Sequence, residues 1–177
     1  MFKVRKVQRW FQAFMVLAII AALFPMPIHA QSQQPSTGIP YTLIGVGSGK
    51  CMDVKDWSKD NGATIQIWEC HFGDNQIWVL ESAGSGYYRI KSKHSGKCLD
   101  VKGASKDDKA RIQLYSCHGK ENQQFKFEIQ SDGTYQIKAR HSGKCIDVQG
   151  ASTSNGATLQ QYRCHGKSNQ RWRPSQD

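Results

Sequence analysis

Beyond residue 40 the chain alternates apolar and polar residues, and no stretch keeps the 3.6-residue apolar rhythm of an amphipathic helix. The alternation is clear in "TIQIW" from Thr64, "RIQLY" from Arg111 and "YQI" from Tyr135. Turn sequences such as "DNG", "AGSG" and "SDG" separate these runs. The pattern predicts an all-β protein built from many short strands.

The alternating segments recur with a period of 47 residues. "GKCMDV", "GKCLDV" and "GKCIDV" begin at Gly49, Gly96 and Gly143. The repeat units are residues 41–87, 88–134 and 135–177, and the last unit is the shortest. Because the three units fill the chain from residue 41 onward, they predict one domain over 41–177.

Each unit contains about four strand-like segments, so the domain has about twelve strands. In the first unit these segments lie near Tyr41, Met52, Ile65 and Ile77. Three units are too few to close a propeller. A closed threefold barrel capped by hairpins, the β-trefoil, fits the strand count and protects the strand edges. This is the fold that we expect.

Strand parity predicts which side chains enter the core. Ile65 and Ile67 point inward, while Gln66 and Trp68 share the opposite face. The second unit repeats this arrangement, but in the third unit Gln161 occupies an inward position, where it is expected to weaken or locally hydrate the core. The aromatic residues that follow the "NQ" pairs are expected in the core: Trp78, Phe125 and Trp172.

The first 30 residues have the features of a secretory signal peptide. Four basic residues precede the apolar run "AFMVLAIIAALF", and a small residue, Ala30, marks the expected cleavage point. The alternative is a retained membrane anchor, which needs roughly 17–25 apolar residues. Residues 31–40 are polar and contain two prolines, as expected for a linker. The interpretation implies a secreted protein, extracellular or periplasmic.

Removing the signal peptide leaves 20 basic and 14 acidic residues, so the net charge falls from +10 to +6. Nucleic-acid binding would need basic residues gathered with aromatic residues on one face. Here lysines and arginines are scattered, and we expect no nucleic-acid partner.

All six cysteines lie in the repeats, two in each unit and 19 residues apart. In an exported chain this predicts disulfides within each unit: Cys51–Cys70, Cys98–Cys117 and Cys145–Cys164. Each would contribute about 3 kcal/mol in the chain-entropy description. The alternative is zinc, suggested by three Cys-His dipeptides, but the cysteine spacing is wide for a zinc site. We expect no metal and no cofactor.

The predicted disulfide suggests a strand register. If the bonded cysteines are directly opposite in an antiparallel pair, then Asp53 lies opposite Trp68. The same register places Asp100 opposite Tyr115, and Asp147 opposite Tyr162. A carboxylate and an aromatic ring would then lie side by side on the outer surface of each unit.

This pairing suits a sugar. An aromatic face packs against the C–H side of a pyranose, a carboxylate accepts hydrogen bonds from hydroxyls, and amides add donors and acceptors. Competing interpretations are that the aspartates cap turns, that the rings pack under loops, or that the second glutamine of each unit satisfies buried backbone groups. The candidate residues are Asp53, Gln66, Trp68, Asn75 and Gln76; Asp100, Gln113, Tyr115, Asn122 and Gln123; and Asp147, Gln160, Tyr162, Asn169 and Gln170.

The threefold C-x-D-V, Q-x-[WY]-x-C-H and N-Q-x-[WF] motifs resemble the ricin-type lectin domain, which includes polysaccharide-binding modules of bacterial hydrolases. The resemblance covers Tyr41 to the C-terminus. It implies a β-trefoil with up to three sugar sites on the same fifteen positions. Phe125 departs from the usual Trp, the shortened third unit puts the rim of its site in question, and Trp57 either extends or obstructs the first site.

We therefore expect a secreted, monomeric carbohydrate-binding protein, with galactose, xylose or a related glycan as ligand. An enzyme is disfavoured because glycoside hydrolysis needs two carboxylates, and each unit repeats only one. The alternatives are a trefoil scaffold that binds a protein, as an inhibitor or toxin subunit does, and an accessory module of a separate glycoside hydrolase.

Overall fold

The computed structural model describes residues 34–176. The predicted signal peptide and the first residues of the predicted linker lie outside the described residues. The later part of that linker contacts the folded domain: Pro35 is buried, the Ser36 N–H donates to the Tyr41 hydroxyl at 2.9 Å, and the Gly38 N–H donates to the Leu80 carbonyl at 2.9 Å. None of the helical turns within residues 34–176 is long and apolar enough to cross a membrane.

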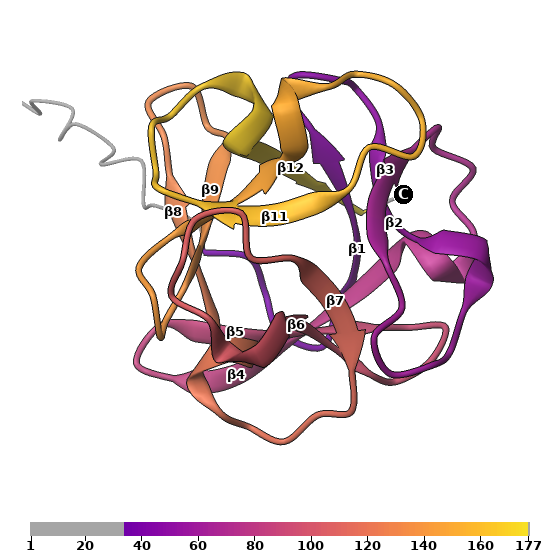
Figure 1. Ribbon diagram of the computed structural model, residues 1–177, viewed down its shortest axis with the longest axis vertical. Coiled ribbons are helices and arrows are strands. Elements are labelled where there is room, and N and C mark those ends of the chain that lie inside the picture. The colour runs from indigo at the N-terminus through magenta and orange to yellow at the C-terminus, as the bar shows by residue number, and fades with distance from the viewer. Residues whose placement is uncertain (1–33, 177) are drawn as a thin grey trace, which may run out of the picture. The chain divides into compact units, whose positions relative to one another are not determined.

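The described chain forms twelve strands connected by turns and short 3₁₀ segments (Figure 1). The strands are β1 Pro40–Gly45, β2 Cys51–Val54, β3 Ile65–Trp68, β4 Ile77–Gly84, β5 Tyr87–Ser92, β6 Cys98–Val101, β7 Ile112–Tyr115, β8 Phe125–Ile129, β9 Tyr135–Ala139, β10 Cys145–Val148, β11 Leu159–Tyr162 and β12 Arg171–Ser175.

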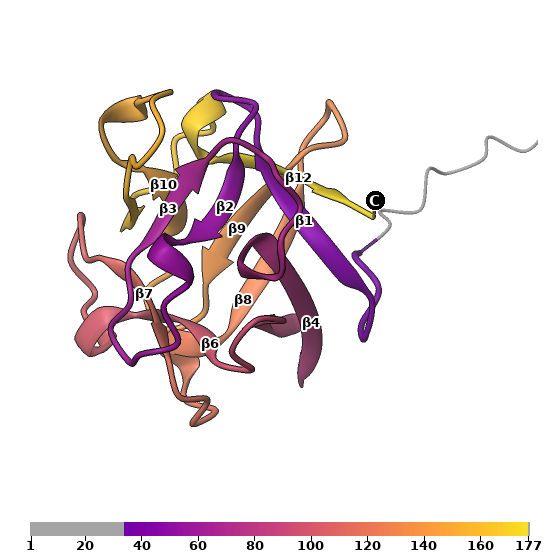
Figure 2. The same cartoon turned by 90° about the vertical axis from the view of Figure 1, so that its right-hand side faces the viewer.

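Six of these strands close a barrel. β1 pairs with β4, β4 with β5, β5 with β8, β8 with β9, β9 with β12, and β12 returns to β1, all antiparallel. Each repeat supplies two of the six barrel strands. The other strands form the hairpins β2–β3, β6–β7 and β10–β11, which lie at one end of the barrel (Figure 2). The prediction of an all-β trefoil is therefore confirmed.

The barrel interior is filled by the predicted apolar residues. Ile65, Ile67 and the equivalent Ile112 have no exposed surface. The aromatic residues that follow the "NQ" pairs are also fully buried, as expected: Trp78, Phe125 and Trp172. The Trp78 indole donates to the Met52 carbonyl at 3.0 Å, whereas Phe125 has no N–H to make the equivalent bond. The substitution thus keeps the packing of the core and loses one polar contact.

The predicted hairpin register is wrong by two residues. Cys51 lies opposite Trp68 and Asp53 lies opposite Gln66, with the same register in the other two hairpins. The disulfides form as predicted, Cys51–Cys70, Cys98–Cys117 and Cys145–Cys164. However, the second cysteine lies beyond the end of its strand, so the bonded cysteines are not a directly opposed pair. The shift is by an even number of residues, so Asp53 and Trp68 still share a face.

Each hairpin is joined to the next by the tip of the loop that precedes β3, β7 or β11. The Asn61 side-chain oxygen accepts from the Ser116 N–H at 2.9 Å, and Asn155 accepts from the Glu69 N–H at 3.0 Å. Asp108 takes the same position between the second and third repeats, accepting from the Arg163 N–H at 3.0 Å. The three repeats therefore hold one another in a closed cycle.

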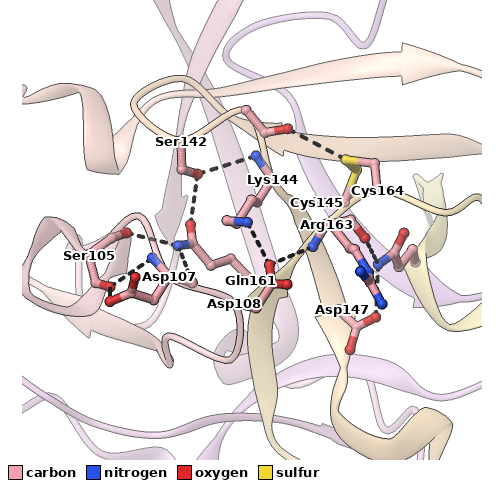
Figure 3. A network of polar contacts seen from close by, with 12 residues as sticks. Ser105, Asp107, Asp108, Ser142, Lys144, Cys145, Asp147, Gln161, Arg163 and Cys164 are labelled. Atoms are coloured by element: carbon pink, nitrogen blue, oxygen red, sulfur yellow. Dashed lines mark hydrogen bonds and ion pairs between the residues drawn. A yellow bond between two sulfur atoms is a disulfide. The ribbon is translucent and has the colours of Figure 1, made fainter.

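Gln161, the polar residue at an inward position, links the second and third repeats (Figure 3). Its amide nitrogen donates to the carbonyls of Ser105 and Asp107, both at 2.8 Å, and its oxygen accepts from the Ser142 hydroxyl at 2.8 Å. The side chain is fully buried. The expectation of a weakened or hydrated core is therefore wrong, because protein groups satisfy the amide.

Replacing Gln161 by leucine, the residue at the equivalent position 114, tests this link. Gln161→Leu leaves the Asp107 carbonyl without its donor, and we expect a loss of about 1–3 kcal/mol in the free energy of unfolding. Ser142→Ala removes one of the three bonds to Gln161 and the 3.3 Å bond from the Lys144 N–H, but it keeps both bonds that Gln161 donates, so it should cost less. Urea denaturation of the three proteins measures both effects, and a more stable Gln161→Leu protein would contradict the assignment.

Asp108 provides a pH test of the same junction. A hydrogen bond from Lys144, at 2.6 Å, together with the Arg163 N–H, lowers the pKa of the Asp108 carboxyl below its usual value. A lowered folded-state pKa gives a stabilising contribution that is present at neutral pH and is lost as pH falls through that pKa. Asp108→Asn, which copies Asn61 and Asn155, should lower the melting temperature at pH 7 and have less effect near pH 2. An equal effect at both pH values would contradict this.

Candidate functional site

Each repeat carries a hollow at an equivalent place on its hairpin. The hollows of the first, second and third repeats have volumes of about 490, 670 and 250 Å³. All three are lined by the aspartate, the first amide, the aromatic ring, the histidine and the asparagine of their repeat. The shared lining is Asp53, Gln66, Trp68, His71 and Asn75; Asp100, Gln113, Tyr115, His118 and Asn122; and Asp147, Gln160, Tyr162, His165 and Asn169.

The aspartate lies at the base of each hollow and accepts hydrogen bonds from three side-chain amides. The Oδ1 of Asp53 accepts from the Gln66 amide at 2.9 Å, and its Oδ2 accepts from the amides of Asn75 at 2.9 Å and Gln76 at 3.0 Å. Asp100 and Asp147 make the same three bonds at 2.7–3.0 Å. We call this group of one carboxylate and three amides the aspartate hub. The aspartates are only 2–3 % exposed, so they lie beneath the surface and not beside the ring on it.

The second glutamine of each repeat is part of the framework. Gln76 is fully buried and does not line the hollow. Besides Asp53, its amide donates to the Glu69 carbonyl at 2.9 Å, and its oxygen accepts from the His71 and Phe72 N–H groups. Gln123 and Gln170 are buried in the same way. The interpretation that these glutamines satisfy backbone groups is confirmed, and they do not face the hollow.

Two of the three aromatic rings are exposed, as predicted, and the third is half-buried. Trp68 and Tyr115 retain 40 % and 38 % of their surface, and Tyr162 is half-buried. The three rings do not have the same surroundings, since the Arg163 guanidinium lies 5.5 Å from the centre of the Tyr162 ring. The rings of the first two hollows are the more open platforms.

The three histidines also belong to the hollows, which the sequence pattern did not establish. The Nε2 of His71, His118 and His165 lies 3.7, 3.4 and 3.5 Å from the hub carboxylate. The Nδ1 of each ring accepts a backbone N–H two residues onward, at 3.2 Å in each case. Because Nδ1 is an acceptor, the proton of the neutral ring is on Nε2, facing the aspartate. The threefold Cys-His dipeptide was the signal that could have located them.

One wall of each hollow comes from another repeat. Gly156 lines the first hollow, Gly62 the second and Lys109 the third. These residues occupy the same place in the loops that join the repeats into a cycle. Spacing within one repeat could not reveal this wall, because the contact joins residues of different repeats.

The rims of the hollows differ in charge and aromatic content. The first has Lys55, Asp56 and Trp57. The second has three basic residues, Lys102, Arg111 and Lys120, which form no ion pair with a carboxylate among residues 34–176. The hubs are therefore alike in all three repeats, while the groups around them are not.

Two family models match the chain. The ricin-type β-trefoil lectin domain matches residues 86–177, and a related ricin-type β-trefoil lectin-like model matches residues 30–115. The chain belongs to the ricin-type β-trefoil lectin family. The first of these matches alone covers more than half of the sequence, and together they include all three repeats of this lectin domain.

Two solved structures resemble the lectin domain over most of the chain. The designed threefold-symmetric protein ThreeFoil is 45 % identical, with a TM-score of 0.75 over 76 % of this chain and 96 % of that one. An exo-β-1,3-galactanase from Clostridium thermocellum is 39 % identical, with a TM-score of 0.77 over 82 % of this chain but only 31 % of the galactanase.

A curated relative shares a shorter segment. Serine protease 1 of Rarobacter faecitabidus is 50 % identical over 36 residues, which are 20 % of this chain and 7 % of the protease. The chain thus spans only a small part of both enzymes that it resembles.

Changing one atom of the aspartate hub tests its role in stability. In Asp100→Asn, an N–H₂ group replaces a carboxylate oxygen in front of three amide donors, so at least one hydrogen bond is lost. Hydrogen bonds to charged groups contribute about 1.5–3 kcal/mol, and we expect the free energy of unfolding to fall by a similar amount. Tyr115→Phe, on the rim of the same hollow, should be close to wild type in the same denaturation experiment. An unchanged Asp100→Asn protein would show that the hub does not support the fold.

Proposed function

We propose that the mature chain is a secreted, non-catalytic carbohydrate-binding protein with one sugar site in each of the three hollows. One observation carries this proposal. In each of the three hollows, an exposed or half-exposed aromatic ring accompanies a buried carboxylate that is hydrogen-bonded by side-chain amides. A single such hollow could be accidental. Three equivalent hollows, each with its own hub, support a common ligand chemistry.

The first hollow offers complementary groups for a pyranose. Trp68 supplies a flat apolar face for the C–H side of the sugar. Asp53 accepts three amide hydrogen bonds, while a carboxylate has about four acceptor positions, so one is left for a hydroxyl. Asn75 and Gln66 line the same hollow and add amide groups to its polar centre.

The sites are shallow, so each single sugar is expected to bind weakly. A dissociation constant of about 1 mM corresponds to about 4 kcal/mol. Three sites on one rigid body can raise the apparent affinity for a polymer by about 10²–10⁴ when they engage it together. A polysaccharide or a glycan-covered surface is therefore the favoured target over a free monosaccharide.

The similarity to part of an exo-β-1,3-galactanase supports galactose-containing polymers as the first ligands to test. The same similarity favours one second candidate function, that of an accessory module which carries a separate glycoside hydrolase to its substrate. Export is supported by the three disulfides, which are typical of oxidising compartments, and by the composition of residues 1–30. We infer a lectin domain over residues 41–177 that follows a cleaved signal peptide and a short linker.

The rings, and not the aspartates, are the appropriate residues for testing the proposal. Trp68→Ala, Tyr115→Ala and Tyr162→Ala together remove the stacking faces but leave the three hubs intact. We expect the triple variant to lose retention on immobilised galactan and xylan by at least about tenfold, because each stacking contact contributes roughly 0.5–1.5 kcal/mol and the three act together. Affinity electrophoresis and a glycan array measure the change.

Aspartate substitutions would disturb the hub and the fold at the same time. The matched control is the triple variant Ile39→Ala, Phe72→Ala and Ile129→Ala, which removes other exposed apolar side chains that do not line the hollows. It should bind like the wild type. A folded wild-type protein that is retained on no glycan would overturn the proposal, and equal retention by the ring variant would overturn the assignment of the sites.

A further inference from the structure

Trp57 is an exposed tryptophan at a position where the other repeats have a much smaller residue. Its counterparts are Ala104 and Ala151, and 48 % of its surface is open to solvent. The ring therefore contributes little to the core of the protein. The indole is exposed and lines the first hollow, so it is available for contact with a ligand.

The backbone around Trp57 is unfavourable for the residues that it carries. Asp56 and Trp57 both have left-handed backbone angles, with φ of 53° and 54°. At the position of Asp56 the other repeats have glycines, Gly103 and Gly150, which adopt φ of 66° without a steric penalty. The fold imposes the conformation on all three repeats, and Ala104 and Ala151 share it with Trp57, so the first repeat differs in carrying Asp56 where the others have glycine. Such strain is concentrated at functional sites.

The surrounding residues are adapted to hold the indole in one place. A Cβ atom on Gly73 would lie only 2.7 Å from Cη2 of Trp57, and the other repeats have Lys120 and Lys167 at this position. The His71 ring stacks on the indole, with 5.9 Å between the ring centres and an interplanar angle of 23°. The His94 ring lies nearly perpendicular to the indole, with 5.3 Å between the ring centres, and its Nε2 lies 2.6 Å from the Trp57 carbonyl oxygen.

Trp57 faces the same hollow as the aspartate hub. It lines the first hollow together with Asp53 and Trp68. The link is His71, whose Nε2 lies 3.7 Å from the Asp53 carboxylate while its ring stacks on Trp57. In the other repeats the equivalent histidine instead lies against the tyrosine of its own hollow, with 6.1–6.2 Å between the ring centres. The first hollow is thus lined by two tryptophan side chains, Trp57 and Trp68, whereas each of the other hollows is lined by one tyrosine.

We propose that Trp57 is a second stacking platform, which makes the first hollow a site for two or more linked sugar rings. Trp68 and Asp53 hold one pyranose, and Trp57 stacks with the next pyranose of a neutral chain. This inference rests on the proposed function, because it extends the same site. It assigns to the first repeat a selectivity for oligosaccharides that the second and third repeats do not share.

The test uses the double variant Tyr115→Ala and Tyr162→Ala, which leaves only the first hollow with its ring. Galactose and β-1,3-linked galactotriose are titrated, with xylose and xylotriose as a second series, and the indole N–H signals of Trp57 and Trp68 are followed by NMR. Galactose should shift the Trp68 signal alone. The trisaccharide should shift both signals.

Trp57→Ala, added to this background, copies the other repeats and should fold normally. We expect it to weaken trisaccharide binding about fivefold and to leave monosaccharide binding within about twofold, because one stacking contact contributes roughly 0.5–1.5 kcal/mol. Phe72→Gly, which removes a neighbouring exposed ring that does not line the hollow, is the matched control and should change neither affinity.

The possible results separate this inference from the proposed function. A Trp68 response with a silent Trp57 would overturn the inference alone. An equal loss of affinity for the monosaccharide and the trisaccharide in Trp57→Ala would overturn it as well. A gain in monosaccharide affinity in that variant would show that Trp57 obstructs the site and would also overturn the inference. The absence of any Trp68 response in either series would overturn the proposed function and, with it, this inference.

Discussion

The structure depends on a buried carboxylate held by three amides, repeated once in each unit. A buried charge is tolerated only where its acceptor positions are filled, and the three amides of each repeat fill most of them. The same amides tie the hairpin to the turn that follows it, since Gln76 also bonds to the backbone near His71. The hub is therefore at once the floor of the hollow and the joint that shapes it. A substitution of the aspartate therefore disturbs the fold and the hollow together.

The closed cycle of loops extends this dependence from one repeat to all three. Each hollow has a wall from another repeat, placed there by the side chain at position 61, 108 or 155. A repeat on its own would lack both that wall and a closed barrel. The separate sites and the whole trefoil therefore form together, and a change at one junction, such as the Asp108–Lys144 contact, acts on stability through the cycle.

The sequence predicted the features that depend on periodicity within a repeat. It did not predict the strand register, the burial of individual amides or the contacts between repeats. The fold, the disulfides and the face of each strand follow from a spacing of 47 and an alternation of two. The hairpin register was missed because Cys70 lies beyond its strand, where a disulfide does not require direct opposition. The burial of Gln76 was left open, since an amide suits a ligand and a backbone group equally. Contacts between repeats, such as Gly156 beside the first hollow, leave no trace in the spacing of one repeat.

The fold also explains how three copies of one site can come to differ. The hub is buried and shared with the framework, so substitutions there cost stability in every repeat. The rim is exposed, and its residues are constrained mainly by the left-handed backbone that the turn imposes. The first repeat has a tryptophan on this backbone and a glycine at position 73 that makes room for it, whereas the second has alanine and lysine. The repeats thus differ at both of two positions that are in steric contact in the first repeat. Divergence confined to the rim keeps the trefoil intact while each hollow acquires its own surroundings.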